Sequence, residues 1–162
     1  MRTEIEAIIM RLRCCNKNQE CIDFFAQYGT SSNPTSGSFI PLNAIFRRGD
    51  EIHLEEETQI VLAPGYLYLI DYVFLATPEA DGFMEIIPYI NGTPRLLYSF
   101  FAPTGAERNT SASAGFTTNE AATSEARLSF RLDYPATTRN IDISGTVSVT
   151  PLMKIGDERG TF

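Results

Sequence analysis

Three cysteines are the residues of this chain best suited to forming covalent links. Cys14, Cys15 and Cys21 lie together near the N-terminus, and the sequence contains no other cysteine. An odd number of thiols cannot pair completely within one chain, so the cluster predicts intermolecular disulfides or free thiols. Zinc binding is the alternative interpretation. Tetrahedral zinc sites usually need four ligands, however, and the single histidine, His53, is far away in the sequence.

Carboxylates are the second group of residues that could catalyse a reaction or bind a metal ion. Glycosidase chemistry needs two carboxylates that face each other, whereas the three adjacent residues Glu55–Glu57 point in different directions at a turn. We therefore interpret them as a solvated acidic loop. A calcium site formed by Asp50, Glu55 and Glu57 is the alternative, because calcium takes oxygen ligands. For Asp71, which lies between Ile70 and Tyr72, we expect a structural hydrogen bond.

The usual signatures of catalysis are missing from the sequence. It contains no glycine-rich phosphate loop before a helix and no Gly-x-Ser-x-Gly elbow. His53 falls at the edge of a short predicted strand, where a surface role is the simplest interpretation. We therefore expect a protein that is not an enzyme and that has no catalytic residues, cofactor or metal.

The balance of charge excludes two classes of partner. Thirteen basic and 20 acidic residues give a net charge of −7. Nucleic-acid binding and docking on anionic lipid both require a basic surface, so we expect neither. No apolar run is long enough to span a bilayer. Glutamate and arginine residues interrupt the segment Met1–Arg13, which predicts no cleaved signal peptide and folding in the cytoplasm.

The pattern of composition divides the chain into four zones. Residues 1–28 read as an N-terminal tail that carries the cysteines, and residues 29–38 as a flexible linker of small residues. Residues 39–155 form the strand-rich domain, and residues 156–162 a short polar tail. Within the first tail, Thr3 and Glu6 make a capping box for a short helix. Its apolar face is a candidate docking surface made of Ile5, Ile8, Ile9 and Leu12.

Short apolar segments separated by turn residues fill the third zone. The dipeptide Asn91-Gly92 between two apolar runs predicts a tight hairpin, and Ala63–Gly65 predicts a turn. Many short strands with turns between them are typical of a sandwich or jelly roll. The predicted fold is therefore an all-β, antiparallel two-sheet jelly-roll sandwich, preceded by a tail that is helical in part or extended.

Two kinds of strand are visible in this zone. In residues 126–134 apolar and polar side chains alternate, which indicates one buried and one wet face. Residues 66–76 are apolar on both faces except at Asp71. A two-layer fold covers one face, so the other predicts an interface with another copy, or a cover supplied by the chain's own tail. The candidate trimer-interface residues are Tyr66, Tyr68, Tyr72 and Phe74.

Four segments of the strand zone resemble a known family. They are the opening Phe39–Leu42, the segment Ile60–Tyr72 with its Pro-Gly-Tyr step, the segment Met84–Gly92, and the aliphatic ending Ile143–Ile155. Together they resemble the bacterial branch of the complement-q/TNF-like trimeric jelly rolls, as in the C-terminal domain of collagen-like spore-surface glycoproteins. The Cys14-Cys15 pair loosely resembles the connectors of spore-appendage subunits.

The resemblance implies a compact homotrimer without an active site. We expect a structural protein whose tail links trimers into a fibre or layer on a spore or cell surface, with itself and other surface-layer proteins as partners. The family's usual collagen stalk is absent from this sequence. A ligand-binding or receptor-binding head is the alternative function, with a site in the loops 77–82, 103–111 or 118–124. A cupin-type enzyme ranks last, because one histidine is too few for its metal.

Overall fold

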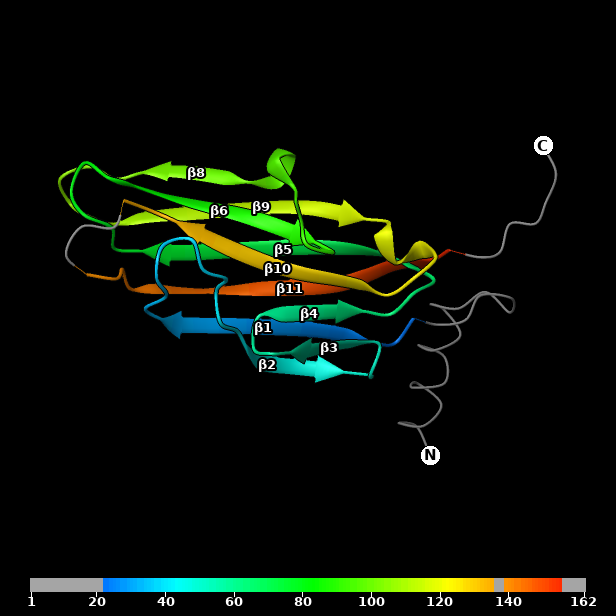
Figure 1. The fold of residues 1–162 in the computed structure, drawn as a ribbon. Helices are drawn as coiled ribbons and strands as arrows, with labels where there is room; N and C mark the ends of the chain where they lie inside the picture. The colour runs from blue at the N-terminus through cyan, green and yellow to red at the C-terminus, as the bar shows by residue number, and fades with distance from the viewer. Residues whose placement is uncertain (1–21, 136–138, 156–162) are drawn as a thin grey trace, which may run out of the picture.

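Two antiparallel β-sheets packed face to face make up the fold (Figure 1). The computed structural model describes residues 22–135 and 139–155. One sheet has five strands in the order β2-β1-β11-β5-β9, and the other has the path β3-β4-β10-β6-β7, with β8 also paired to β6. The strands are β1 Phe25–Ser32, β2 Asn43–Arg48, β3 Ile52–Glu55, β4 Gln59–Leu62, β5 Tyr66–Ala76, β6 Phe83–Ile90, β7 Thr93–Pro94, β8 Phe100–Pro103, β9 Thr110–Thr118, β10 Ala126–Asp133 and β11 Ile143–Lys154. Two short 3₁₀ helices, η1 Leu96–Tyr98 and η2 Glu120–Ala122, lie beside the strands.

The predicted jelly-roll sandwich is confirmed, and its turns follow from local chemistry. Asn91 and Gly92 both have positive φ, at 51° and 75°, which is the conformation that a two-residue hairpin requires. The predicted hairpin between β6 and β7 is therefore present. Gly65, with φ of 88°, makes the turn that starts β5. None of the helices within the described ranges is long and apolar enough to cross a membrane.

Aromatic side chains from both sheets fill the space between them. The ring of Phe130 on β10 lies 5.2 Å from that of Tyr72 and 5.8 Å from that of Phe74, both on β5. Full burial of a side chain of this size contributes about 1.5–3 kcal/mol to stability. The strand β10 shows the expected alternation at its apolar positions, which are buried, and at its two arginines, which are partly exposed. Ser129, expected on the wet face, is buried.

The N-terminal boundary of the domain differs from the sequence-based one. Strand β1 includes Gly29–Ser32, which the composition had placed in a linker, and it lies between β11 and β2. Tyr28, predicted to be in the tail, has no exposed surface. The segment after β1 is also held, since the Ser36 hydroxyl donates to the Tyr134 carbonyl oxygen at 2.7 Å. A linker was predicted because small residues rarely build a core. Backbone pairing with β11 nevertheless holds Gly29–Ser32 in the sheet.

Candidate functional site

The outer side of the neighbouring strands β1, β11, β5 and β9 carries few charged side chains. We call it the flat face. Cross-strand pairing places Leu75 of β5 beside Ser144 of β11 and Ser111 of β9, and Val73 beside Thr146 and Ser113. Leucine and valine thus form a ridge between two rows of small hydroxyl residues. The flat face comprises Gln27, Ser31, Leu67, Leu69, Asp71, Val73, Leu75, Ser111, Ser113, Thr117, Ser144, Thr146, Ser148 and Thr150.

Asp71 is the one charged residue of the flat face. A Cβ atom at Gly115 would lie 2.5 Å from its Oδ1 atom, so the absence of a side chain there makes room for the carboxylate. The hydrogen bond expected for Asp71 is not found among the described residues. Its neighbour Ser148 instead accepts a hydrogen bond from the Gln27 side chain at 3.2 Å. The Asp71 carboxylate is therefore exposed and available to a partner.

The predicted interface residues lie on the opposite side of β5. Tyr68, Tyr72 and Phe74 are buried between the sheets, and Tyr66 is half-buried against Phe24 with 4.9 Å between ring centroids. One face of β5 packs in the core, as expected, but it is the aromatic face that carries the predicted interface residues. The aliphatic face, with Val73 and Leu75, is outside. The reason is volume, because the larger side chains fill the gap between the two sheets.

Burial changes the acidity of the core tyrosines. Burial raises the pKa of Tyr28 to about 12, although the Arg47 charge lowers it in part. Burial likewise raises the pKa of Tyr68 and of Tyr72. The Tyr72 hydroxyl donates to the Tyr98 carbonyl oxygen at 2.8 Å, and the Tyr68 hydroxyl to that of Ala63 at 3.0 Å. The paired hydroxyls of Tyr68 and Tyr72 stabilise the core, and all three tyrosines are buried.

A second exposed surface, which we call the apolar edge, consists of Leu96, Leu97, Phe100 and Phe101. Leu97 is 93% exposed and Phe101 is 56% exposed. They belong to η1 and β8, at the upper margin of the sandwich in Figure 1. Sequence analysis missed this surface. Two apolar doublets, Leu96-Leu97 and Phe100-Phe101, are the sequence signal for this surface. Adjacent residues of a strand point to opposite sides, so only one residue of each doublet can face the core.

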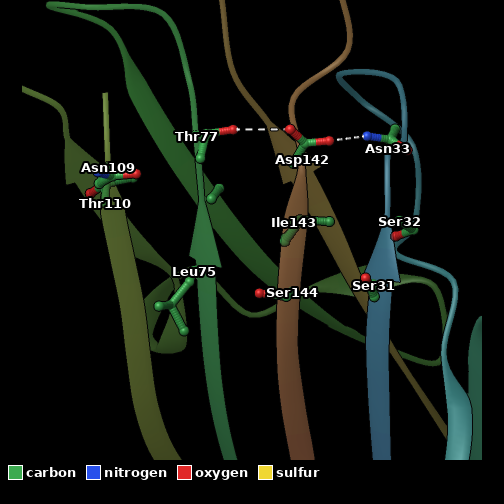
Figure 2. Close-up of a pocket in the computed structure, with 11 residues that line it drawn as sticks. Ser31, Ser32, Asn33, Leu75, Thr77, Asn109, Thr110, Asp142, Ile143 and Ser144 are labelled. Carbon is green, nitrogen blue, oxygen red and sulfur yellow. Dashed lines mark hydrogen bonds between the residues drawn. The ribbon is translucent and has the colours of Figure 1, made fainter. Parts of the chain in front are cut away.

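A polar hollow of about 490 Å³ lies at one end of the flat face (Figure 2). It is formed where β1, β11, β5 and β9 begin or end side by side. The Asp142 carboxylate accepts hydrogen bonds from the Asn33 side chain and from the Thr77 hydroxyl, the latter at 3.5 Å. The hollow is lined by Ser31, Ser32, Asn33, Leu75, Ala76, Thr77, Asn109, Thr110, Asp142, Ile143 and Ser144. It includes parts of two loops that the sequence had suggested for a ligand site.

The acidic segment near β3 is engaged in ion pairs. Glu55 lies 2.5 Å from Arg127, and the pKa of its carboxyl is lowered first by the hydrogen bond from Arg127 and then by that from His53. His53 lies 3.4 Å from the same carboxylate, at the surface. Within the described ranges, no three histidine, cysteine, aspartate or glutamate side chains are grouped so as to hold a metal ion. The calcium alternative gains no geometric support.

Several predicted residues lie outside the described ranges. They are the cysteines Cys14, Cys15 and Cys21 and the helical positions Ile5, Ile8, Ile9 and Leu12. The predictions for disulfide bonds and for tail docking therefore remain predictions.

Comparison with known proteins gives a match in fold only. No model of a protein family matches this chain, and no curated protein matches it in sequence. Among solved structures, the globular domain of zebrafish complement 1qA protein is similar with a TM-score of 0.52 and 8% identity. That match covers 82% of this chain and 98% of the other.

Two further solved structures have lower TM-scores. Murine APRIL has a TM-score of 0.48 and 12% identity, over 78% of this chain and 98% of the other. The PRD1 vertex protein P5 has a TM-score of 0.49 and 11% identity, over 85% and 100%. The order of the strands and the likeness to the complement 1qA domain together show that this chain has a jelly-roll fold.

Proposed function

We propose that this protein is a non-enzymatic structural protein that forms homotrimers through its jelly roll. The flat face is the observation that carries the proposal. Val73 and Leu75 are 39% and 53% exposed in the single chain, and only Asp71 is charged. Exposed apolar patches on soluble proteins mark interaction surfaces, and the centres of interfaces are depleted in charge.

The apolar edge supports a particular kind of contact. It lies at the margin formed by η1 and β8, whereas the flat face is a broad sheet surface, so the two surfaces differ in place and shape. An edge that packs on the face of the next copy is a heterologous contact, which generates a ring when the rotation closes. Closure at three copies is what the resemblance to trimeric jelly rolls implies.

The cysteines support a further step from trimer to fibre. Cys14, Cys15 and Cys21 precede the domain, and their odd number favours bonds between chains. Disulfides form once the surroundings become oxidising, as they do on a spore or cell surface after release from the cytoplasm. We infer that the tail links trimers into a surface fibre or layer.

Sedimentation velocity on the full chain tests the trimer. With its cysteines kept reduced, the wild type is expected to have three times the 18.0 kDa chain mass. Val73→Glu places a charge in the flat face and is expected to give monomers. Phe39→Glu is the matched control, because Phe39 is similarly exposed, at 41%, but is paired to the other sheet at Arg131. A monomeric wild type, or a trimeric Val73→Glu variant, contradicts the proposal.

The link through cysteines has its own experiment. Oxidised wild-type protein is expected to run as disulfide-linked multimers on a non-reducing gel and to form filaments in electron micrographs. A variant with all three cysteines replaced by serine is expected to stay as discrete trimers. Identical soluble species from both proteins would contradict the fibre while leaving the trimer intact.

Ligand binding by the same domain is the second candidate function. The polar hollow favours ligand binding, because ligand sites are concave and have a few polar groups that point into the same cavity. The hollow is built from one chain, so this function does not require assembly.

A further inference from the structure

We propose that the polar hollow is a binding site for a neutral saccharide. This inference rests on the second candidate function, ligand binding. The hollow shares Ser31, Leu75 and Ser144 with the flat face, so ligand binding requires that this end of the face stays open in the proposed trimer. The hollow lies where four neighbouring strands of the five-stranded sheet begin or end (Figure 2). Its volume of about 490 Å³ falls within the range of small-molecule sites and suits a ligand of one or two sugar rings.

Two rows of residues line the hollow, and all of them except Leu75 are polar. Ser31 pairs with Ser144, which pairs with Leu75, and these residues form the first row. Two residues further along each strand lie Asn33, Asp142 and Thr77, which form the second row. Asn33, Thr77 and Asp142 lie just past the ends of their strands, and both rows line the hollow.

Asp142 is held in place at the centre of the second row. Its Oδ1 atom accepts a hydrogen bond from the Asn33 amide and its Oδ2 atom one from the Thr77 hydroxyl. The backbone repeats the connection, because the Thr77 amide donates to the Asp142 carbonyl oxygen at 3.1 Å. Each carboxylate oxygen has further acceptor capacity. An oriented carboxylate can therefore accept from ligand hydroxyls with little loss of side-chain freedom.

Donors and acceptors without an internal role surround this carboxylate. Among the described residues, the side chains of Ser31, Ser144 and Asn109 make no hydrogen bond to the protein. A serine hydroxyl both donates and accepts, and an asparagine amide does the same through separate atoms. Sugar hydroxyls have the same double capacity, so this lining matches a polyhydroxylated ligand.

The exposed side chain of Leu75 and the negative charge of Asp142 indicate which polyhydroxylated ligands the site favours. Leu75 lies beside the polar rows with 53% of its surface exposed, and it can cover the C–H face of a sugar ring. Asp142 is the one ionisable side chain in the lining. A lone negative charge repels phosphate and carboxylate groups, so the site favours a neutral ligand over an acidic one.

Saturation-transfer NMR on the full chain tests the site. The probes are the methyl glycosides of glucose, galactose, mannose, N-acetylglucosamine, fucose and rhamnose, each at about 10 mM, a concentration that saturates a site with Kd of about 1 mM. At least one of them is expected to receive saturation from the protein, and glucose 6-phosphate is expected to receive none. If none of the six receives saturation, the inference is overturned.

Variants locate the binding. Asn109→Ala and Asp142→Asn are expected to weaken binding of the responding glycoside by about tenfold, because each removes or alters a hydrogen-bonding group in the hollow. Asn109 makes no internal side-chain hydrogen bond, so the variant is expected to fold normally. Ser113→Ala is the control for a flat-face residue outside the hollow. Equal Kd values for Asn109→Ala, Asp142→Asn and wild type would overturn the inference.

The same samples separate this inference from the trimer. Sedimentation of Asn109→Ala is expected to match that of the wild type, because the substituted side chain lies in the hollow and not on the ridge. Glycoside binding by a wild-type protein that sediments as a monomer would support the site and contradict the trimer. A trimer that binds none of the six glycosides would support assembly and overturn the site.

Discussion

Tyr72 and Tyr28 are both buried, but only the Tyr72 hydroxyl has a hydrogen-bond partner among the described residues. Comparing the two residues therefore separates the contribution of the hydrogen bond from that of ring packing. The Tyr72 hydroxyl donates to the Tyr98 carbonyl oxygen. The Tyr28 hydroxyl is buried and has no hydrogen-bond partner among the described residues. Both rings lie in the core between the two sheets. A buried hydroxyl with a partner stabilises the fold, whereas an unpaired buried hydroxyl lowers the free energy of unfolding, because no hydrogen bond replaces those it made with water.

Replacing each tyrosine by phenylalanine tests this difference. Tyr72→Phe is expected to lower the free energy of unfolding by about 1 kcal/mol, because it leaves the Tyr98 carbonyl oxygen unpaired. Tyr28→Phe is expected to leave the stability unchanged or to raise it. Urea denaturation of both variants and of wild type measures the effect. An equal loss in both variants would show that the Tyr28 hydroxyl has a partner in solution.

The same tyrosines predict how stability depends on pH. Burial raises the pKa of Tyr28 to about 12 from the ordinary value of 10.0, and raises that of Tyr68 and Tyr72. Above pH 10 the folded state therefore holds more protons than the unfolded state, and the free energy of unfolding falls as pH rises. Below pH 10 these groups contribute no pH dependence.

Urea denaturation between pH 9 and 12 checks this expectation, at values bracketing the ordinary tyrosine pKa of about 10. The fall is expected to start near pH 10 and to be less steep in the Tyr72→Phe variant, which removes one of the titrating groups. A profile that is flat to pH 12 in the wild type would contradict the burial of these hydroxyls.

At the scale of elements, the pairing of β11 with β5 depends on one close approach. A Cβ atom at Gly145 would lie 2.1 Å from the Val73 carbonyl oxygen and 2.8 Å from the Phe74 Cα atom. These are backbone atoms, which cannot move aside without separating the strands. Gly145→Ala is therefore expected to lower the free energy of unfolding by about 1–3 kcal/mol.

Gly105 provides the matched control for this prediction. A Cβ atom there would meet nothing within 4 Å, so Gly105→Ala is expected to leave stability nearly unchanged. Thermal unfolding followed by circular dichroism compares the two variants. Similar melting temperatures for Gly145→Ala and Gly105→Ala would mean that β11 and β5 are less tightly paired than the structure indicates.

Elements with strong local signals were predicted well from the sequence. The Asn91-Gly92 hairpin and the alternation in β10 depend on residues close together in the chain, and both are confirmed. Strand β1 was missed because Gly29–Ser32 has no local strand signal and pairs with residues more than a hundred positions away. The apolar run after the Asn91-Gly92 hairpin is not one continuous strand, because a 3₁₀ turn at Leu96–Tyr98 separates β7 from β8.

The candidate surfaces depend on the same distinction. Alternation within β5 showed that both of its faces are apolar. Which face is buried depends on packing against the second sheet, and the sequence of β5 alone does not show this. The polar hollow was out of reach, because Ser31, Leu75, Asn109 and Ser144 come together only through cross-strand register. Sequence periodicity indicates which residues share a side of one strand and says little about neighbouring strands.

At the scale of the whole molecule, a heterologous contact predicts an unusual result on mixing. Leu97→Glu damages the apolar edge but leaves the flat face intact, and Val73→Glu does the reverse. Each variant alone is expected to be monomeric with an unchanged fold, since both side chains are exposed. An equal mixture is expected to form a complex of one chain of each kind, because one intact edge can meet one intact face.

Native mass spectrometry of the mixture, with one variant isotope-labelled, identifies such a complex. A mixture that stays monomeric would argue against contact between edge and face. Trimers in the Leu97→Glu sample alone would remove the apolar edge from the proposed interface while leaving the role of the flat face open to the Val73→Glu result.

The position of β11 also constrains how the protein is made. Among the described strands β11 comes last in the chain, yet it lies in the middle of its sheet, between β1 and β5. Gln27 and Ser148, which are hydrogen-bonded between β1 and β11, are 121 residues apart. During synthesis the earlier strands leave the ribosome before their central neighbour exists. The sheet therefore closes only after translation has reached the final strand, and the nascent chain must stay soluble until then.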